Sequence, residues 1–298
     1  LGNLAILTHG GCIVYPNDGF EPLSVLQAVE DEKCTGLHGV PTMFIAELDH
    51  PEFASFDLST LRTGIMAGSS CPIEVMRRVI DKMHMQEVTI AYGMTETSPV
   101  SCQTNKHTPL EKQVSTVGLV QPALEVKVVD TDTGEILPLG ETGELLTRGY
   151  SVMKGYWGSR FKTREAIQDG WMHTGDLATM DEDGYVKIVG RSKDMVIRGG
   201  ENIYPVEIEN YLYRHPKIRD VQIVGVPDER YGEVLAAWII PKEHGSLTEE
   251  EVRQFCREHI AHYKVPSYFR FVTEYPMTIT GKIQKYKIIE QMKEELGL

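Results

Sequence analysis

The sequence lacks the features of several broad classes of protein. Its 298 residues contain no run of about 18 apolar residues, the length that a membrane-spanning helix requires. Its net charge of -13, from 43 acidic and 30 basic residues, argues against a surface built mainly to hold nucleic acid or anionic lipid, because such surfaces gather Lys and Arg. Any phosphate group must therefore be held by a local basic site.

Cysteine and metal-binding patterns are also missing. The five cysteines are an odd number without a Cys-x-x-Cys pair, which fits neither a disulfide framework nor a zinc cluster, so we expect a reducing compartment. His259 and His262 lie three residues apart on a predicted helix, but no third ligand is near them, and we treat both as structural. The first residues show neither the basic region nor the cleavage pattern of a signal peptide.

The first third of the chain alternates helix and strand patterns. Apolar residues at helical spacing follow Pro22, and a second helical set ends at Met83. Short apolar segments at 61–67 and 88–91 have the length of strands. Two successive helix-then-strand units predict a parallel sheet whose carboxyl-end loops gather where α/β proteins bind ligands. The polar stretch AYGMTETSPV, 91–100, is expected at that edge.

A β-rich region follows at 118–190, where short apolar runs alternate with turn signals such as TDTG and DEDG. The charged tetrad RSKD, 191–194, then precedes a separable α+β pattern of about a hundred residues. Within it, the Gly-Gly pair at 199–200 has the form of a hairpin turn, and Thr248 with Glu251 forms a capping box. The chain length also favours two domains.

Four motifs occur in series, with HGVPTMF (38–44) ahead of them: YGMTETSP (92–99), WMHTGDLA (171–178), GRSKDMVIRGGENIYPVEIE (190–209) and PMTITGKIQK (276–285). In order and spacing they resemble the motifs of the adenylate-forming superfamily, which contains acyl-CoA synthetases, luciferases and peptide-synthetase adenylation domains. The resemblance covers essentially the whole chain. In its general sequence pattern the chain is most similar to mitochondrial medium-chain acyl-CoA synthetases of mammals.

This resemblance implies an α/β fold in two parts. Residues 1–190 correspond to the C-terminal part of a large AMP-binding domain, with a parallel sheet and a β-rich subdomain. A hinge at 191–194 follows, and residues 195–298 form a small mobile α+β domain. The family's Gly/Ser/Thr-rich phosphate loop is absent from this sequence, which therefore resembles a C-terminal piece of a longer enzyme. We expect the 298-residue chain alone to bind ATP poorly and to turn over little substrate.

The resemblance also implies the substrates: a carboxylic acid, ATP with Mg²⁺, and CoA. The carboxylate forms acyl-AMP and pyrophosphate, and the CoA thiol then displaces AMP; both steps develop negative charge, which enzymes stabilise by positioning and by cations. Medium-chain fatty acids and the mitochondrial matrix follow only from the similarity just named, and the cytoplasm is the other expected compartment. The sequence does not indicate an oligomeric state.

In this interpretation, the segment after the predicted strand at 88–91 contains residues that bind the nucleotide. By resemblance, Thr95 bonds the α-phosphate, Glu96 ligates Mg²⁺ and the Tyr92 ring packs on adenine. Gly93 lets the backbone come close to the ligand. Taken alone, the segment fits a Ser/Thr-rich turn with an exposed Glu equally well. The hypothesis therefore depends on the other motifs.

Two further groups resemble nucleotide contacts of the family. Gly68, Ser69 and Ser70 match its adenine-side loop, although a helix cap at Ser70 is an alternative. Asp176 matches the carboxylate that binds the ribose, and Arg191 matches its partner on the ribose. A turn residue and an ordinary surface charge are the alternatives for this pair.

By resemblance, the small domain supplies a different group to each of the two half-reactions. Lys282 matches the lysine of the adenylation step, and a compact ammonium suits an oxygen between phosphate and carboxylate. Lys193, with Asp194 beside it, matches the hinge about which the small domain turns. Gly199 and Gly200 match the hairpin that lines the pantetheine channel. Alone, these residues also fit a solvated lysine face and an ordinary hairpin.

The acid-binding residues are the least distinctive. His38, Gly39, Val40 and Met94 lie where the family lines its acid site, and small or apolar residues there suit an alkyl chain. Core packing explains Val40 and Met94 equally well. Three other functions remain possible: adenylation with a carrier-protein thiol as acceptor, non-catalytic adenylate binding, and a phosphate-loop nucleotidase, for which GxxxxGK[ST] is missing.

Overall fold

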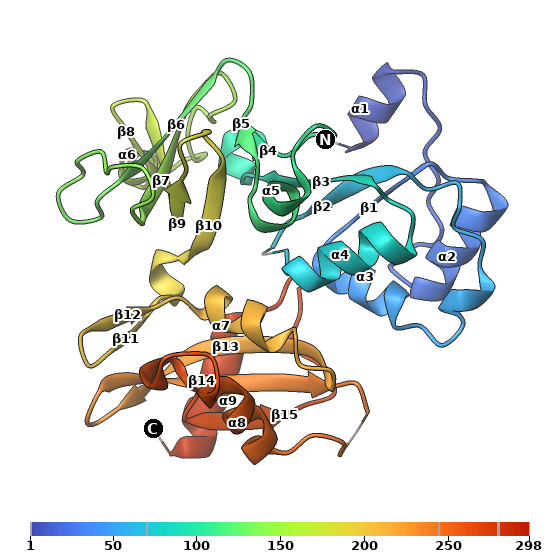
Figure 1. Ribbon diagram of the computed structural model, residues 1–298. Helices are drawn as coiled ribbons and strands as arrows, with labels where there is room; N and C mark the ends of the chain where they lie inside the picture. Colours follow the sequence, from blue (N-terminus) through green and yellow to red (C-terminus); the bar gives the residue numbers. More distant parts are fainter. Residues whose placement is uncertain (1, 70, 244, 279–280, 298) are drawn as a thin grey trace. The chain divides into compact units, whose positions relative to one another are not determined.

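The computed structural model describes residues 2–69, 71–243, 245–278 and 281–297 (Figure 1). The chain divides into two compact units, Leu1–Ile188 and Val189–Leu298. Each unit has its own buried apolar core. None of the helices in the described ranges combines the length and the apolar character needed to cross a bilayer.

The first sheet of unit 1 has the strand order β1-β2-β3-β4-β5. Strands β1, β2 and β3 are parallel, as the sequence predicts, whereas β4 and β5 are antiparallel to their neighbours. The sheet is therefore mixed, because two strands of two residues each extend it beyond β3. The strands are β1 (Gly36–Gly39), β2 (Thr63–Ala67), β3 (Glu87–Tyr92), β4 (Cys102–Gln103) and β5 (Leu119–Val120).

Helices cover this sheet, and Figure 1 shows α3 and α4 over one face of β1–β3. Pro22 begins α2 because its fixed φ suits the first helical turn, and the Glu21 carboxylate caps that turn by accepting from the backbone N–H groups of Leu23 and Ser24. The helices are α1 (Gly2–Thr8), α2 (Pro22–Asp31), α3 (Pro41–Leu48), α4 (Ile73–Lys82) and α5 (Leu110–Ser115).

The second sheet of unit 1 is the predicted β-rich region. Its order is β10-β9-β7-β6, and the short strand β8 pairs with β9. Strand β10 continues from unit 1 into unit 2, since the division falls between Ile188 and Val189. The elements are β6 (Leu124–Val129), β7 (Gly143–Gly149), α6 (Arg160–Ala166), β8 (Ile167–Gln168), β9 (Trp171–Met180) and β10 (Val186–Arg191).

Unit 2 is an α+β fold around the hairpin of β13 and β14. Its sheet has the order β12-β11-β14-β13, and β15 pairs in parallel with β14. The elements are β11 (Val196–Arg198), β12 (Glu201–Ile203), α7 (Pro205–Leu212), β13 (Ile218–Asp228), β14 (Gly232–Pro241), α8 (Glu249–Arg257), β15 (Tyr268–Phe271) and α9 (Lys285–Leu296).

Both faces of the central hairpin of unit 2 are buried. One face packs with residues of α7 and α8, among them Ile208 and Val252, and the other packs with Ile288 and Met292 of α9. This two-sided burial explains why β14 is an almost continuous apolar run rather than an alternating one. The predicted capping box is confirmed, because the Thr248 hydroxyl accepts from the Glu251 N–H and the Glu251 carboxylate accepts from the Thr248 N–H.

Candidate active site

The segment after β3 makes a tight turn that is fixed from inside. The Thr97 side chain is buried; its hydroxyl accepts from the Met94 N–H at 3.1 Å and donates to the Met94 carbonyl oxygen at 3.1 Å. A Cβ atom on Gly93 would lie 1.7 Å from the carbonyl oxygen of Pro99, so no larger residue fits there without a backbone shift. One threonine thus holds the turn, while Thr95 is exposed and Glu96 is half-buried.

A hydrogen bond joins the two sheets of unit 1 at this turn. The Tyr92 hydroxyl, at the end of β3, donates to Oδ2 of Asp176 on β9 at 2.7 Å, across 84 residues of sequence. Asp176 is only 7% exposed. Burial, and then the negative charge of Asp176, hold the pKa of Tyr92 well above its ordinary value, so the phenol remains a donor. The predicted adenine and ribose residues are therefore direct neighbours.

The strand segment that carries Asp176 is held to its neighbour, β7, by side-chain hydrogen bonds. Glu144 accepts from the Gly175 N–H at 2.9 Å, and its other oxygen lies 2.9 Å from Nδ1 of His173. The buried Thr174 hydroxyl donates to the Leu145 carbonyl at 2.6 Å. Gly175 has a φ of +69°, in the left-handed region that favours glycine. Sequence reasoning missed Glu144 and His173, although the histidine stands within the motif WMHTGDLA.

Glu96 also has a partner that sequence reasoning missed. The Tyr156 hydroxyl donates to Oε1 of Glu96 at 2.9 Å, and the Met153 N–H donates to the Glu96 carbonyl oxygen at 2.8 Å. The hydrogen bond to the Glu96 carboxylate raises the pKa of Tyr156. The only sequence signal was a pair of aromatic residues after Gly155 in a turn-rich segment.

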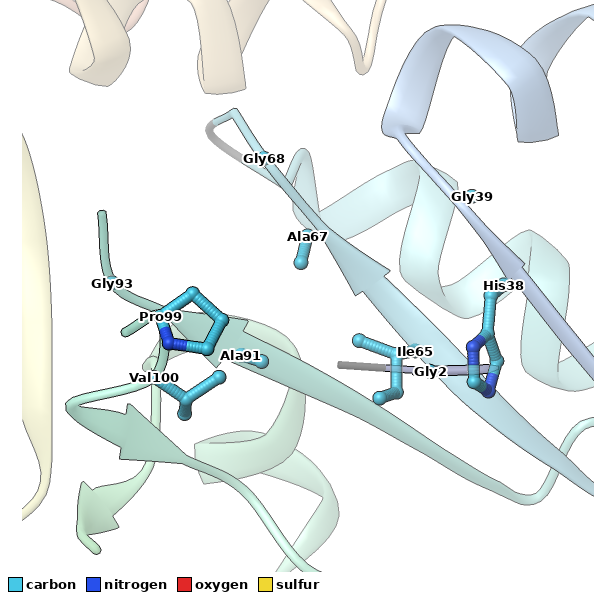
Figure 2. A pocket seen from close by; sticks show the side chains of 10 residues that line it. All are labelled: Gly2, His38, Gly39, Ile65, Ala67, Gly68, Ala91, Gly93, Pro99 and Val100. Carbon is cyan, nitrogen blue, oxygen red and sulfur yellow. The ribbon is translucent and has the colours of Figure 1, made fainter. Parts of the chain in front are cut away.

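A cavity of about 270 Å³ lies at the carboxyl ends of the parallel strands, inside unit 1 (Figure 2). Figure 2 shows His38 and Ile65 toward one end of it and Pro99 and Val100 toward the other. Desolvation lowers the pKa of His38, which favours its neutral form. The lining residues are Gly2, His38, Gly39, Ile65, Ala67, Gly68, Ala91, Gly93, Pro99 and Val100.

The cavity draws on two of the groups that the sequence assigned separately. His38 and Gly39, predicted for the acid, line it together with Gly68 and Gly93, predicted for the nucleotide. Val40 and Met94 do not appear among its lining residues; Val40 precedes α3, and Met94 precedes the turn at 95–97. Ser69 is exposed beyond β2, and Ser70 lies outside the described residues.

In unit 2, Lys282 is exposed on a short loop before α9. Its N–H donates to the Thr278 hydroxyl at 3.1 Å, and its carbonyl oxygen accepts from the Thr278 N–H at 2.8 Å. Gly281 has a φ of +77°, which permits the tight turn. The neighbouring Thr280 lies outside the described residues.

A partly buried ion pair holds the end of this loop. Lys285, at the start of α9, places its ammonium 2.7 Å from Oε1 of Glu209 on α7, and the same ammonium donates to the Ile223 carbonyl oxygen at 3.2 Å. Glu209 also accepts from the Ile223 N–H at 2.9 Å. Lys285, three residues after Lys282, is thus bound through its side chain to α7 and β13 of unit 2.

The predicted hinge and hairpin residues lie at the start of unit 2. Arg191 is the last residue of β10, and Lys193 and Asp194 belong to the 3₁₀ turn Ser192–Asp194. Gly199 and Gly200 connect β11 to β12 with φ values of +60° and +91°, so the predicted hairpin is confirmed as a local structure. Their roles in motion and in CoA binding stay predictions.

The chemistry of Glu96 fits the proposed metal. Within the described ranges, no group of three or more His, Cys, Asp and Glu side chains could form a metal cage. Mg²⁺ does not need one, because it binds through one or two carboxylates together with substrate phosphates and water. A half-buried Glu96 next to the exposed Thr95 supplies such a carboxylate. The His259 ring lies 5.9 Å from the Tyr211 ring between centroids, and the structural role expected of His259 and His262 stays a prediction.

Residues 1–157 match the AMP-binding enzyme family, and residues 207–282 match the AMP-binding enzyme C-terminal domain. The chain therefore belongs to the AMP-binding enzyme family. Among solved structures, it is similar to the anthranilate CoA ligase AuaEII in complex with anthranoyl-AMP, with a TM-score of 0.89 and 31% identity over 97% of this chain and 55% of that one. ATP-bound MatB from Rhodopseudomonas palustris gives a TM-score of 0.86 and 31% identity over 98% and 57%. The predicted adenylate-forming fold is confirmed.

Two groups of curated relatives match over 100% of this chain. The Bacillus subtilis (strain 168) protein named "Putative acyl-CoA synthetase YngI" is 55% identical, and the chain covers 54% of it. The "Medium-chain acyl-CoA ligase ACSF2, mitochondrial" is 50% identical in Danio rerio, with 49% covered, and 46% identical in Homo sapiens, with 48% covered. The chain spans about half the length of these relatives. Because the bacterial relative has the higher identity, a mitochondrial location of this chain stays a prediction.

Proposed function

We propose that this chain belongs to an ATP-dependent ligase that activates a carboxylic acid as acyl-AMP and passes the acyl group to the thiol of CoA. One observation carries the proposal: Tyr92, which bonds to the buried carboxylate of Asp176, is followed by Gly93, which lines a cavity without charged side chains, and then by the Thr95–Glu96 turn. They offer an acceptor for ribose hydroxyls, oxygen ligands near phosphates and space for an acyl group. The names of the relatives support the same reaction.

In the first step, an oxygen of the substrate carboxylate attacks the α-phosphorus of ATP, and the bond to the bridging oxygen of pyrophosphate breaks. Asp176 accepts from the ribose hydroxyls, with Arg191 as the second ribose contact. The Thr95 hydroxyl donates to the α-phosphate, and the Lys282 ammonium offsets the charge between phosphate and carboxylate. Glu96 would hold the Mg²⁺, which would neutralise phosphate oxygens.

In the second step, the thiol sulfur attacks the acyl carbon, the bond from that carbon to the AMP oxygen breaks, and the thiol proton is released. The two steps need different groups beside one carbonyl, so unit 2 turns about Lys193 and Asp194 between them. The Gly199–Gly200 hairpin then lines the path of the pantetheine arm, where the absence of side chains leaves room.

The cavity indicates the class of acid. Its lining has no charged side chain, because the lowered pKa of His38 favours the neutral imidazole near pH 7. A charged amino acid would lose its hydration without a partner there, whereas an alkyl chain gains from the contact. A cavity of about 270 Å³ is small for a ligand site. Together with the names of the ACSF2 relatives, these features favour medium-chain fatty acids.

Pyrophosphate release from the full-length protein, measured over a panel of carboxylic acids with ATP and Mg²⁺, tests the proposal. We expect release with acids of medium chain length, transfer of the acyl group to free CoA, and a loss of more than about 100-fold in Lys282→Ala. Lys287→Ala, at an exposed position in the first turn of α9, is the matched control and should retain activity.

Two results would redirect the assignment. Acyl transfer to a carrier-protein thiol but not to free CoA would point to a carrier-dependent adenylation enzyme. AMP binding without pyrophosphate release, unchanged in Lys282→Ala, would point to a non-catalytic adenylate-binding protein. The chain 1–298 alone should show little turnover, and substantial acyl-CoA formation by it would contradict the need for a phosphate loop from outside this sequence.

A further inference from the structure

Glu96 is clamped by a segment that lies far from it in sequence. Two hydrogen bonds reach it from residues about 60 positions later: the Tyr156 phenol donates to Oε1 at 2.9 Å, and the Met153 N–H donates to the main-chain oxygen at 2.8 Å. The first contact fixes the carboxylate and the second fixes the backbone. The side chain and its main chain are therefore positioned together.

Tyr156 is itself held in place by the first turn of α6. Its N–H donates to the Thr163 hydroxyl at 2.9 Å, and its carbonyl oxygen accepts from the Ser159 N–H at 3.2 Å. The Thr163 hydroxyl donates in turn to the Ser159 carbonyl oxygen at 2.8 Å. A Cβ atom on Gly155 would lie 2.7 Å from the Thr163 side chain, so the close approach requires glycine there. The phenol is thus aimed at Glu96 by a preformed turn.

The kind of donor matters for a carboxylate that binds a cation. A lysine or arginine at this position would also orient Glu96, but its positive charge would repel a metal ion. A phenol donates one hydrogen bond without adding charge. Its hydrogen bond is made to Oε1 and leaves the Oε2 side of the carboxylate for a cation, and Mg²⁺ commonly binds a carboxylate beside phosphate oxygens. Partners of this kind orient metal ligands and contribute to metal affinity.

We infer that Tyr156 is a positioning residue, which holds the Glu96 carboxylate in the orientation that receives the Mg²⁺ of the nucleotide. The inference rests on the proposed function, because it takes the metal to arrive with ATP. Tyr156 acts through Glu96 and needs no contact with the substrate. Its effect should therefore be found in the dependence on Mg²⁺ rather than in the maximal rate.

Tyr156→Phe removes only the hydroxyl, and Tyr150→Phe is its matched control, because Tyr150 is exposed in the same segment. In the full-length protein, we expect Tyr156→Phe to raise the Mg²⁺ concentration for half-maximal pyrophosphate release about 10-fold. The rate at saturating Mg²⁺ should fall less than about threefold, since the groups around the α-phosphorus are unchanged. Tyr150→Phe should leave both quantities unchanged.

The contact itself is tested without ligand or turnover, in the 298-residue chain labelled with ¹³C at the tyrosine ζ carbon. At one fixed pH near 7, the resonance missing from Tyr156→Phe identifies Tyr156, and Glu96→Gln should shift that resonance but not the one missing from Tyr150→Phe. Equal Mg²⁺ dependence in Tyr156→Phe and wild type, or a Tyr156 resonance unmoved by Glu96→Gln, would overturn the inference.

The two arms separate the possible failures. If the full-length wild-type protein releases no pyrophosphate with any acid, the proposed function is wrong, and the metal role of Tyr156 falls with it, while the carbon resonance still reports the contact. If wild type is active and only the Mg²⁺ dependence of Tyr156→Phe is unchanged, the proposed function stands and the role of Tyr156 is wrong.

Discussion

Glu47 is a carboxyl group in the core of unit 1. It lies near the end of α3, is only 2% exposed, and its Oε2 has no hydrogen-bond partner among the described residues. Burial raises the pKa of Glu47 from the ordinary 4.5 to about 8, so the folded chain carries it protonated at neutral pH. The unfolded chain ionises the same group in water. Folding is therefore coupled to proton uptake at this site.

The size of the effect follows from the two pKa values. Between about pH 4.5 and pH 8 the folded state holds a proton that the unfolded state has lost, so the free energy of unfolding falls as pH rises, by about 1.4 kcal/mol per pH unit. Glu47→Gln is similar in shape and cannot ionise. We expect it to match wild type near about pH 5 and to be more stable by about 3 kcal/mol near pH 7, with the difference growing until about pH 8.

Urea unfolding of the 298-residue chain at several pH values measures this difference. Trp171 reports on unit 1, which contains Glu47, whereas the buried Trp238 reports on unit 2 and serves as an internal reference. Glu52→Gln, at an exposed site shortly after α3, is the matched control and should leave the pH dependence unchanged. A Glu47→Gln chain whose stability runs parallel to that of wild type from pH 5 to pH 8 would refute the reasoning.

Three further changes probe contacts of the site and its support. Tyr92→Phe removes the donor to the buried Asp176 and should lower the free energy of unfolding of unit 1 by about 1–3 kcal/mol. It should also weaken AMP binding by the full-length protein, measured by calorimetry. Unchanged values of both would show that the contact contributes nothing. Lys285→Met leaves the buried Glu209 carboxylate without its cation and should destabilise unit 2 by about 3–5 kcal/mol in thermal unfolding. Adding Glu209→Leu should restore most of this stability, and a double variant no more stable than the single one would contradict the reasoning. Gly93→Ala places a methyl group 1.7 Å from a backbone oxygen and should lower the melting temperature of unit 1, and a wild-type melting temperature would disprove the close approach.

The parts of the fold that sequence predicts well are those decided by local chemistry. The Gly199–Gly200 hairpin and the capping box of Thr248 follow from backbone preferences and side-chain reach over a few residues, and the structure confirms both. The parallel pairing of β15 with β14 and the two-residue strands β4 and β5 were not predicted. Their partners come from distant segments, and their lengths carry no periodic signal.

The residues of the candidate site also divide into those that are adjacent in sequence, which could be predicted, and those that are far apart, which could not. The turn at Thr95 and Glu96 was found because its residues are contiguous and stand in a distinctive motif. The bonds of Glu96 to Tyr156 and of Tyr92 to Asp176 join residues 60 and 84 positions apart, and a single sequence does not encode such pairings in a readable pattern. The roles assigned to Lys282 and to the other nucleotide and CoA residues stay predictions, since no ligand contact tests them.

The bond between Tyr92 and Asp176 also has a consequence for assembly. Each partner belongs to a different sheet, so the proposed nucleotide site is complete only while the two sheets of unit 1 stay docked. By mass action, an adenylate that contacts both residues must favour the docked arrangement over any state in which the sheets separate. A bound adenylate would then stabilise the contact between the two sheets, and the resistance of unit 1 to proteases would rise with the fraction of chains that bind it.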